Sequence, residues 1–231
     1  MRLADLTSRE AETLGDALLA IPVGSTEQHG PHLPLDTDTR VAAALAEALA
    51  AERDDVVVGP SLAYGASGEH ETFAGTASIG REALETLVVE LVRSASRTFR
   101  RVLLVNWHGG NADPVGRAVR RLRAERREVL SWWPRHGGGD AHAGRTETAL
   151  MLALASDDVR LDRAEAGNAA PLAELIEVIR AASVRAVSPN GVLGDPAGAT
   201  AAEGRVLFDR LADDLVAAVA AWARGLESPH P

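Results

Sequence analysis

Apolar runs that end in polar, glycine-rich loops recur along this sequence, and a stretch of helical periodicity follows each loop. The clearest run, 101–106, is typical of a strand buried inside a parallel sheet. Further runs lie at 17–23, 56–58 and 129–133, and helical patterns cover 39–53, 81–99 and 113–126. Strands that alternate with helices in this way predict an α/β fold, a three-layer α/β/α sandwich with a mostly parallel sheet. We expect residues 1–231 to form one domain, because this length suits a single core.

Local signals add detail to this outline. The capping-box patterns at 7–10 and 200–203 predict two further helix starts. The region from about 156 to 200 is less regular, and its glycines and prolines at 188–196 predict turns.

The composition excludes several kinds of chemistry. The sequence has no cysteine, so disulfides, thiolate nucleophiles and Cys-ligated zinc are excluded. All 24 basic residues are arginine, which excludes Schiff-base lysines and the P-loop lysine. The net charge of −9 argues against nucleic acid as the main partner. No apolar run approaches the ~20 residues of a membrane span and no signal segment opens the chain, so we expect a cytoplasmic protein without a membrane partner.

The stretch 24–38 is unusually rich in reactive side chains. It holds two histidines and three carboxylates between a predicted strand and a predicted helix, with glycines and prolines that fix the backbone. Glu27 and His29 are two residues apart on extended backbone, so their side chains leave on the same face. Asp38 is predicted at the N-cap of the following helix. A simple polar turn would need far fewer such groups, so we expect a functional site here.

Six of the seven histidines lie in predicted loops, and four of these loops follow strands. They are His29, His32, His70, His108, His136 and His142. Because the carboxyl ends of parallel strands share one edge of the sheet, the loops that follow strands are expected to converge. Histidine and carboxylate groups without cysteine suit divalent zinc, iron or manganese. His32 and His136 can be structural or functional on this pattern, and no role is expected for His230.

We expect Asp38 to bridge two metal ions, with Glu27, His29 and His108 as terminal ligands. Such a pair lowers the pKa of a bridging water and so holds a hydroxide ready at neutral pH. The chain lacks cysteine and lysine nucleophiles and shows no Gly-x-Ser-x-Gly elbow, which favours metal-activated water as the nucleophile.

Three segments resemble the signature segments of the creatininase family of metal-dependent amidohydrolases. They are 24–34 together with Asp38, Asn-Trp-His-Gly-Gly-Asn at 106–111, and His-Ala-Gly-Arg-Thr-Glu-Thr at 142–148. The resemblance covers nearly the whole chain in the family's order. It implies a creatininase-like fold and a homo-oligomer.

The resemblance also implies roles for particular residues. Glu27 and His108 bind one metal, His29 binds the other, Asp38 bridges them, and His142 is the catalytic histidine. Creatininase itself has a glutamate two residues after the His108 position, where this chain has Gly110. Our candidate for the missing second-metal ligand is Glu147, which can instead act in catalysis by orienting His142.

The expected substrate is a peptide. Segments 35–40, 139–147 and 187–196 resemble a branch of the family that releases a C-terminal Val-Tyr dipeptide from a modified ribosomal peptide during redox-cofactor biosynthesis. One alternative keeps the chemistry and takes a small cyclic or formyl amide, as in creatininase or formamide deformylases. Another is a non-catalytic metabolite-binding α/β module, which would leave the expected metal ligands unexplained.

Overall fold

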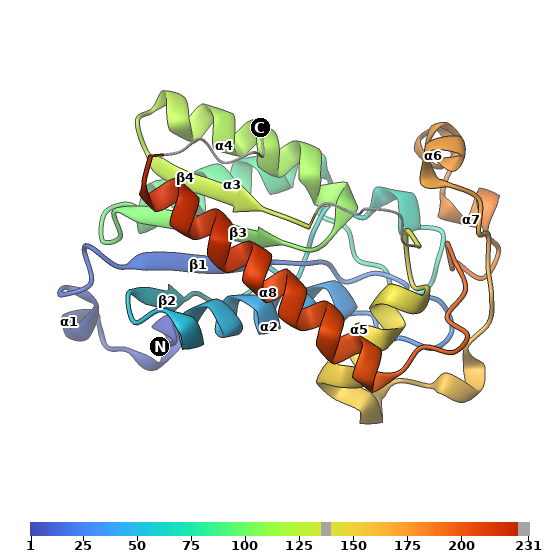
Figure 1. Ribbon diagram of the computed structural model, residues 1–231. Helices are drawn as coiled ribbons and strands as arrows, with labels where there is room; N and C mark the ends of the chain where they lie inside the picture. Colours follow the sequence, from blue (N-terminus) through green and yellow to red (C-terminus); the bar gives the residue numbers. More distant parts are fainter. Residues whose placement is uncertain (135–139, 226–231) are drawn as a thin grey trace.

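Four parallel strands form the central sheet of the computed structural model, which describes residues 1–134 and 140–225 (Figure 1). The strand order is β2-β1-β3-β4, so β1 and β3 lie inside the sheet and β2 and β4 at its edges. Their bounds are β1 (Leu18–Val23), β2 (Val56–Val58), β3 (Arg101–Asn106) and β4 (Glu128–Trp132). Each strand lies within one residue of its predicted range.

Helices cover both faces of the sheet, as the sequence predicts. Side chains alternate along β1, so that Leu18 and Ala20 pack into one core while Leu19 and Ile21 pack into the other. The second core is closed by α3 (Arg81–Ala95) and α4 (Ala112–Ala124). The first core is closed by α2 (Thr37–Glu52), α5 (Arg145–Ala155) and the long α8 (Ala201–Ala223), which crosses this face in Figure 1. The three-layer α/β/α prediction is confirmed.

The start of α2 corrects one prediction. The helix begins at Thr37, and Asp36 rather than Asp38 takes the N-cap position. The Thr37 hydroxyl and backbone N–H both donate to the Pro34 carbonyl, which turns the chain into the helix two residues early. Asp38 therefore lies inside the first turn, where its carboxylate accepts a 2.6 Å hydrogen bond from Ser25 Oγ instead of capping the helix.

Both predicted capping signals form, and two short helices lie where the sequence predicts none. The predicted capping box forms at the start of α1 (Ser8–Ala11), and Thr200 caps α8 through the backbone N–H of Glu203. Between α5 and α8 lie α6 (Leu172–Ala181) and α7 (Val184–Val187), neither of which the sequence predicts as a helix. No helix among the described residues is long and apolar enough to span a bilayer.

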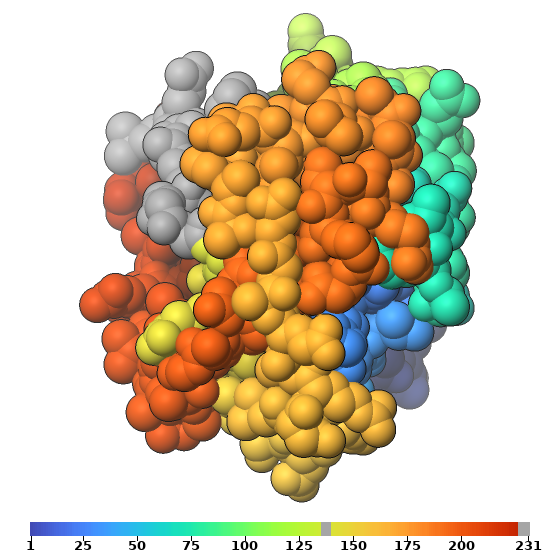
Figure 2. Space-filling view, turned by 90° about the vertical axis from the view of Figure 1, so that its right-hand side faces the viewer, coloured from blue at the N-terminus to red at the C-terminus, as the bar shows by residue number. Residues whose placement is uncertain are grey.

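The segment from α6 to residue 196 covers the carboxyl end of the sheet. Figure 2 faces this end and shows the orange segment lying over the blue and teal loops. The 188–196 region forms the predicted turns, and Leu193 pairs with the backbone of His142. Its small apolar core joins Leu193 to Phe73, Leu175 and Ile179. The strand-end loops are thereby enclosed.

Candidate metal centre

All six sequence-predicted site residues meet at the carboxyl edge of the sheet. We call them the cluster: Glu27, His29, Asp38, His108, His142 and Glu147. They come from the loop after β1, the first turn of α2, the loop after β3, and the loop and first turn at the start of α5. Glu27 and His29 are fully buried, and even Glu147 exposes only 14% of its side chain. A set of carboxylates this deeply buried requires cationic partners.

Asn111 ties the loops of the cluster together. Its side-chain amide donates to the carbonyl of Gly24 after β1 and to the Asn106 side chain at the end of β3. Its Oδ1 accepts from the backbone N–H of Ala66 in the loop after β2. Gly24 in turn has no room for a side chain, because a Cβ there would lie 2.4 Å from the Cα of Thr39. These contacts fix the strand ends relative to α2.

The first half of the cluster consists of Glu27, Asp38 and His108. His108 Nδ1 lies 3.2 Å from Glu27 Oε1 and 3.3 Å from Asp38 Oδ2. One ligand atom from each residue lies within 4.8 Å of the others, which is close enough for all three to share one ion. His108 directs its other ring nitrogen to the carbonyl of Ala66, at 3.2 Å.

The second half consists of His29, Asp38 and Glu147. His29 Nε2 lies 3.2 Å from Asp38 Oδ1 and 3.8 Å from Glu147 Oε2, and these three residues also satisfy the 4.8 Å grouping. Glu147 is held by the indole N–H of Trp107 at 3.0 Å and by the backbone N–H of Ala143 at 2.7 Å. The two oxygens of Asp38 thus face different imidazoles, one in each half.

His142 lies between the halves. Its Nε2 is 2.8 Å from the backbone carbonyl of Gln28, its Nδ1 is 3.9 Å from Glu27 Oε1, and its ring centre is 4.4 Å from that of His29. Glu27, His29 and His142 form a third group within 4.8 Å, so the position suits either proton transfer or ligation. Ala143 follows with φ of 52°, a left-handed conformation that turns the chain into α5.

Burial and opposite charge compete in setting the pKa values of His29 and Glu27. Burial lowers the pKa of His29, but the carboxylates of Asp38 and Glu147 outweigh it and raise this pKa to about 10. Burial raises the pKa of Glu27, yet His108 and His70 outweigh it and hold this pKa at about 2. Neighbouring histidines likewise lower the pKa of Asp38 against the effect of burial, so Glu27 and Asp38 stay ionised and attract cations. Both oxygens of Glu27 are buried with no hydrogen-bond partner among the described residues, an arrangement that fits a metal ion.

The remaining histidines divide into three cases. His32 bonds to Thr148 Oγ1 at 2.8 Å, belongs to none of the three ligand groups, and has its pKa lowered to about 4 by burial. His136 and His230 lie outside the described residues. His70 joins the site, with Nε2 3.4 Å from Glu27 Oε1. The glycine-rich loop after β2 signals a functional segment, but nothing in its spacing selects His70 as a member of the cluster.

Gly110 has no space for the glutamate that creatininase carries at this position. A Cβ on Gly110 would lie 2.3 Å from the carbonyl oxygen of Ala66 and 2.5 Å from His108 Nε2. Glu69 also approaches this nitrogen, at 3.7 Å, but belongs to none of the ligand groups among the described residues. Glu147 is thus the carboxylate that the fold brings to the second half.

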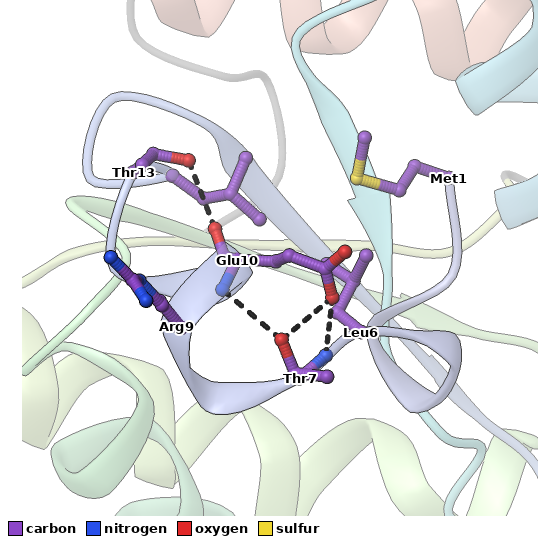
Figure 3. Close-up of a pocket in the computed structure, with 7 residues that line it drawn as sticks. Met1, Leu6, Thr7, Arg9, Glu10 and Thr13 are labelled. Atoms are coloured by element: carbon purple, nitrogen blue, oxygen red, sulfur yellow. Dashed lines mark hydrogen bonds between the residues drawn. The ribbon is translucent and has the colours of Figure 1, made fainter.

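A hollow lies at α1, at the opposite end of the molecule from α5 and α7 (Figures 1 and 3). It encloses about 620 Å³ and is lined by Met1, Leu6, Thr7, Arg9, Glu10, Thr13 and Leu14. Thr7, Glu10 and Thr13 are paired within its lining, since the backbone N–H and hydroxyl of Thr7 donate to Glu10 and Thr13 Oγ1 donates to the Glu10 carbonyl. The hollow has no counterpart to the cluster's buried ligands.

The fold and the cluster are those of an α/β amidohydrolase. The chain belongs to the creatininase family, since residues 4–219 match the family model described as creatinine amidohydrolase. It is 50% identical over 233 residues to the mycofactocin precursor peptide peptidase of Mycobacterium ulcerans, covering 96% of this chain and 92% of that protein. The family resemblance predicted from the motifs is confirmed.

Solved structures agree with this assignment. A crystal structure of creatinine amidohydrolase (creatininase) superimposes with a TM-score of 0.78 at 26% identity, covering 99% of this chain and 98% of the other. A mutant creatininase described as the Zn-Zn type gives 0.76 at 25% identity, covering 94% and 96%.

Proposed function

We propose that this chain is a dinuclear metallopeptidase that hydrolyses an amide bond near the C-terminus of a modified precursor peptide and releases a Val-Tyr dipeptide. The proposal of two metal ions rests on the position of Asp38, which directs one carboxylate oxygen toward each half of the cluster. The peptide substrate is supported by the name of the Mycobacterium ulcerans relative at 50% identity.

Glu27, Asp38 and His108 would hold one divalent ion, and His29, Asp38 and Glu147 the other. Zinc, iron and manganese all suit this donor set, and the Zn-Zn type of the creatininase neighbour supports zinc. When bound, the ions supply Lewis acidity and a water of lowered pKa. Trp107 and Ala143 hold Glu147 in place through their N–H groups.

His142 is proposed to transfer the proton that amide hydrolysis requires. The departing nitrogen must be protonated, because an amide anion is too basic to leave. His142 donates its Nε2–H to the Gln28 carbonyl, which leaves Nδ1 as the free basic nitrogen directed toward Glu27. Burial lowers the pKa of His142, so the ring is neutral at rest and can accept a proton before delivering it to the leaving amine.

The test is hydrolysis of synthetic peptides that end in Val-Tyr, followed by mass spectrometry of the products. The metal-loaded protein is expected to release the dipeptide, and chelator-treated protein is not. Creatinine and an N-formyl amide serve as parallel substrates. Turnover of either small amide with no cleavage of the peptide would overturn the peptidase proposal in favour of the small-amide alternative. Absence of metal from the active protein would overturn the dinuclear centre.

A further inference from the structure

The imidazoles of the cluster share one pattern of outer contacts. The outer nitrogens of His29, His108 and His142 each meet a backbone carbonyl, at 3.2, 3.2 and 2.8 Å, respectively. A carbonyl only accepts, so in the neutral ring the outer nitrogen carries the hydrogen. The inner nitrogen then presents a lone pair to the carboxylates. In this neutral form, all three rings can bind a cation.

Gln28 breaks this pattern at a fourth imidazole. Its Oε1 accepts the backbone N–H of Gly30 at 2.9 Å, and its Nε2 donates to the carbonyl of Gly191 at 3.2 Å. Both contacts would become repulsive if the amide were reversed, so its orientation is determined. Two ring nitrogens lie within reach of the remaining hydrogen of Nε2, His70 Nδ1 at 2.8 Å and His142 Nε2 at 3.0 Å. Because His142 Nε2 carries its own hydrogen toward the Gln28 carbonyl at 2.8 Å, it cannot accept, and the remaining amide hydrogen goes to His70 Nδ1. His70 must therefore accept at Nδ1 and carry its hydrogen on Nε2.

The hydrogen of His70 faces inward as a result. Its Nε2 lies 3.4 Å from Glu27 Oε1, while the inner nitrogens of His108 and His142 approach the same oxygen with lone pairs when neutral. Among the described residues, His70 is the one imidazole whose neutral form directs a hydrogen at the cluster.

We propose that Gln28 and His70 form a donor relay that positions the Glu27 carboxylate for its metal ion. Gln28 sets the tautomer of His70, and His70 directs its Nε2–H at Oε1 of Glu27 over 3.4 Å, an electrostatic contact that is too long and poorly aligned to be a hydrogen bond. Both are positioning residues, and their role rests on the proposed function only in taking Glu27 as a metal ligand. The partner that holds a metal-ligating carboxylate typically contributes about 10- to 100-fold to metal affinity or activity.

Close packing fixes the position of the Gln28 side chain. Gln28 is only 5% exposed, and Gly191 lies directly against it, since a Cβ on Gly191 would be 2.0 Å from Gln28 Oε1. Gly191 also has φ of 82°, which favours glycine. The 188–196 turn that covers the cluster therefore presents a bare backbone carbonyl to the amide.

Nuclear magnetic resonance of the metal-free wild-type protein tests the tautomer without any variant. Gln28 is the single glutamine of the chain, so glutamine labelling gives one side-chain amide signal. We expect a scalar coupling across the hydrogen bond between this amide and Nδ1 of His70. We also expect the ring hydrogen of His70 to reside on Nε2. The signals of His70 are assigned by their absence from the spectrum of the His70→Gln variant. A hydrogen on Nδ1 of His70 would overturn the proposal.

Zinc affinity, measured by competition with a chelator, tests the consequence. Gln28→Met and His70→Leu are each expected to weaken binding of one zinc ion about 10- to 100-fold. The double variant is expected to lose no more zinc affinity than the weaker-binding single variant, because Gln28 acts through His70. His70→Gln keeps a donor and is expected to restore most of the loss. Additive losses, or wild-type affinity in His70→Leu, would contradict the relay.

Neither measurement depends on peptide hydrolysis. A protein with the expected His70 tautomer and zinc affinities but no peptidase activity would overturn the proposed function and leave the relay standing. If the variants do not fold, the wild-type resonance pattern still decides between the two tautomers.

Discussion

The two halves of the cluster hold their carboxylates in different ways. Glu27, in the first half, is fully buried, and neither of its oxygens has a hydrogen-bond partner among the described residues. Glu147, in the second half, accepts N–H groups from Trp107 and Ala143 and is partly exposed. A buried carboxylate without hydrogen bonds is costly unless a cation balances it, whereas neutral donors hold Glu147 in place by themselves. The first half therefore needs a cation to balance its buried charge, whereas hydrogen bonds already fix the carboxylate of the second half.

Removal of the shared ligand gives the largest expected effect. Asp38→Ala is expected to abolish activity and lower metal content in both halves, because Asp38 is the residue common to the two ligand groups. Metal analysis of the purified variant checks this expectation. Two tightly bound ions per chain in Asp38→Ala would rule out the bridging role.

His142→Ala separates catalysis from metal binding. We expect both ions to remain and the peptide still to bind, while kcat falls by about 10²- to 10⁴-fold, the usual contribution of general acid catalysis. Steady-state kinetics and metal content are measured on the same preparation. Loss of an ion would make His142 a ligand, consistent with its place in the third group, and near-normal turnover with full metal content would refute the proton-transfer role.

Glu147→Gln addresses the second half alone. The amide keeps the size of the side chain but loses its charge, and we expect affinity for one ion to fall by at least about 10- to 100-fold while the ion beside Glu27 stays bound. Chelator competition resolves the two affinities. If metal content stays normal and turnover falls, Glu147 orients His142 instead. Normal metal content together with normal turnover would exclude both roles.

The pH dependence of metal binding is the mildest of these effects. Without metal, His29 keeps its proton up to pH about 10 because of the neighbouring carboxylates, so an ion that binds its Nε2 must displace that proton. Affinity for the second half should therefore rise with pH, about tenfold per unit, and level off near pH 10. Isothermal titration in buffers of different ionisation enthalpy measures the released proton. Binding at pH about 7 without proton release would show that His29 is not a ligand.

The strands and the main cluster could be predicted from the sequence because their signals are local. Buried parallel strands such as β3 are continuous apolar runs, and Glu27, His29 and Asp38 lie within a dozen residues of one another. The sequence predicts the start of α2 two residues late, because the Pro34 carbonyl that sets the start at Thr37 is a contact of the folded loop. The sequence does not predict α6, because its apolar residues pack into a small separate core with Phe73, far away in sequence.

The outer contacts of the cluster could not be predicted in the same way. Gln28 and His70 are 42 positions apart, and Gln28 and Gly191 are 163 positions apart, so only the folded chain shows that they meet. The same holds for Trp107 and Glu147, whose hydrogen bond joins the end of β3 to α5.

The most direct test of the dinuclear centre is anomalous X-ray diffraction from crystals of the metal-loaded protein. We predict two separate peaks, one beside Glu27 and His108 and one beside His29 and Glu147, with an oxygen of Asp38 bound to each. A single peak, or a second peak ligated by His142 in place of Glu147, would contradict the account.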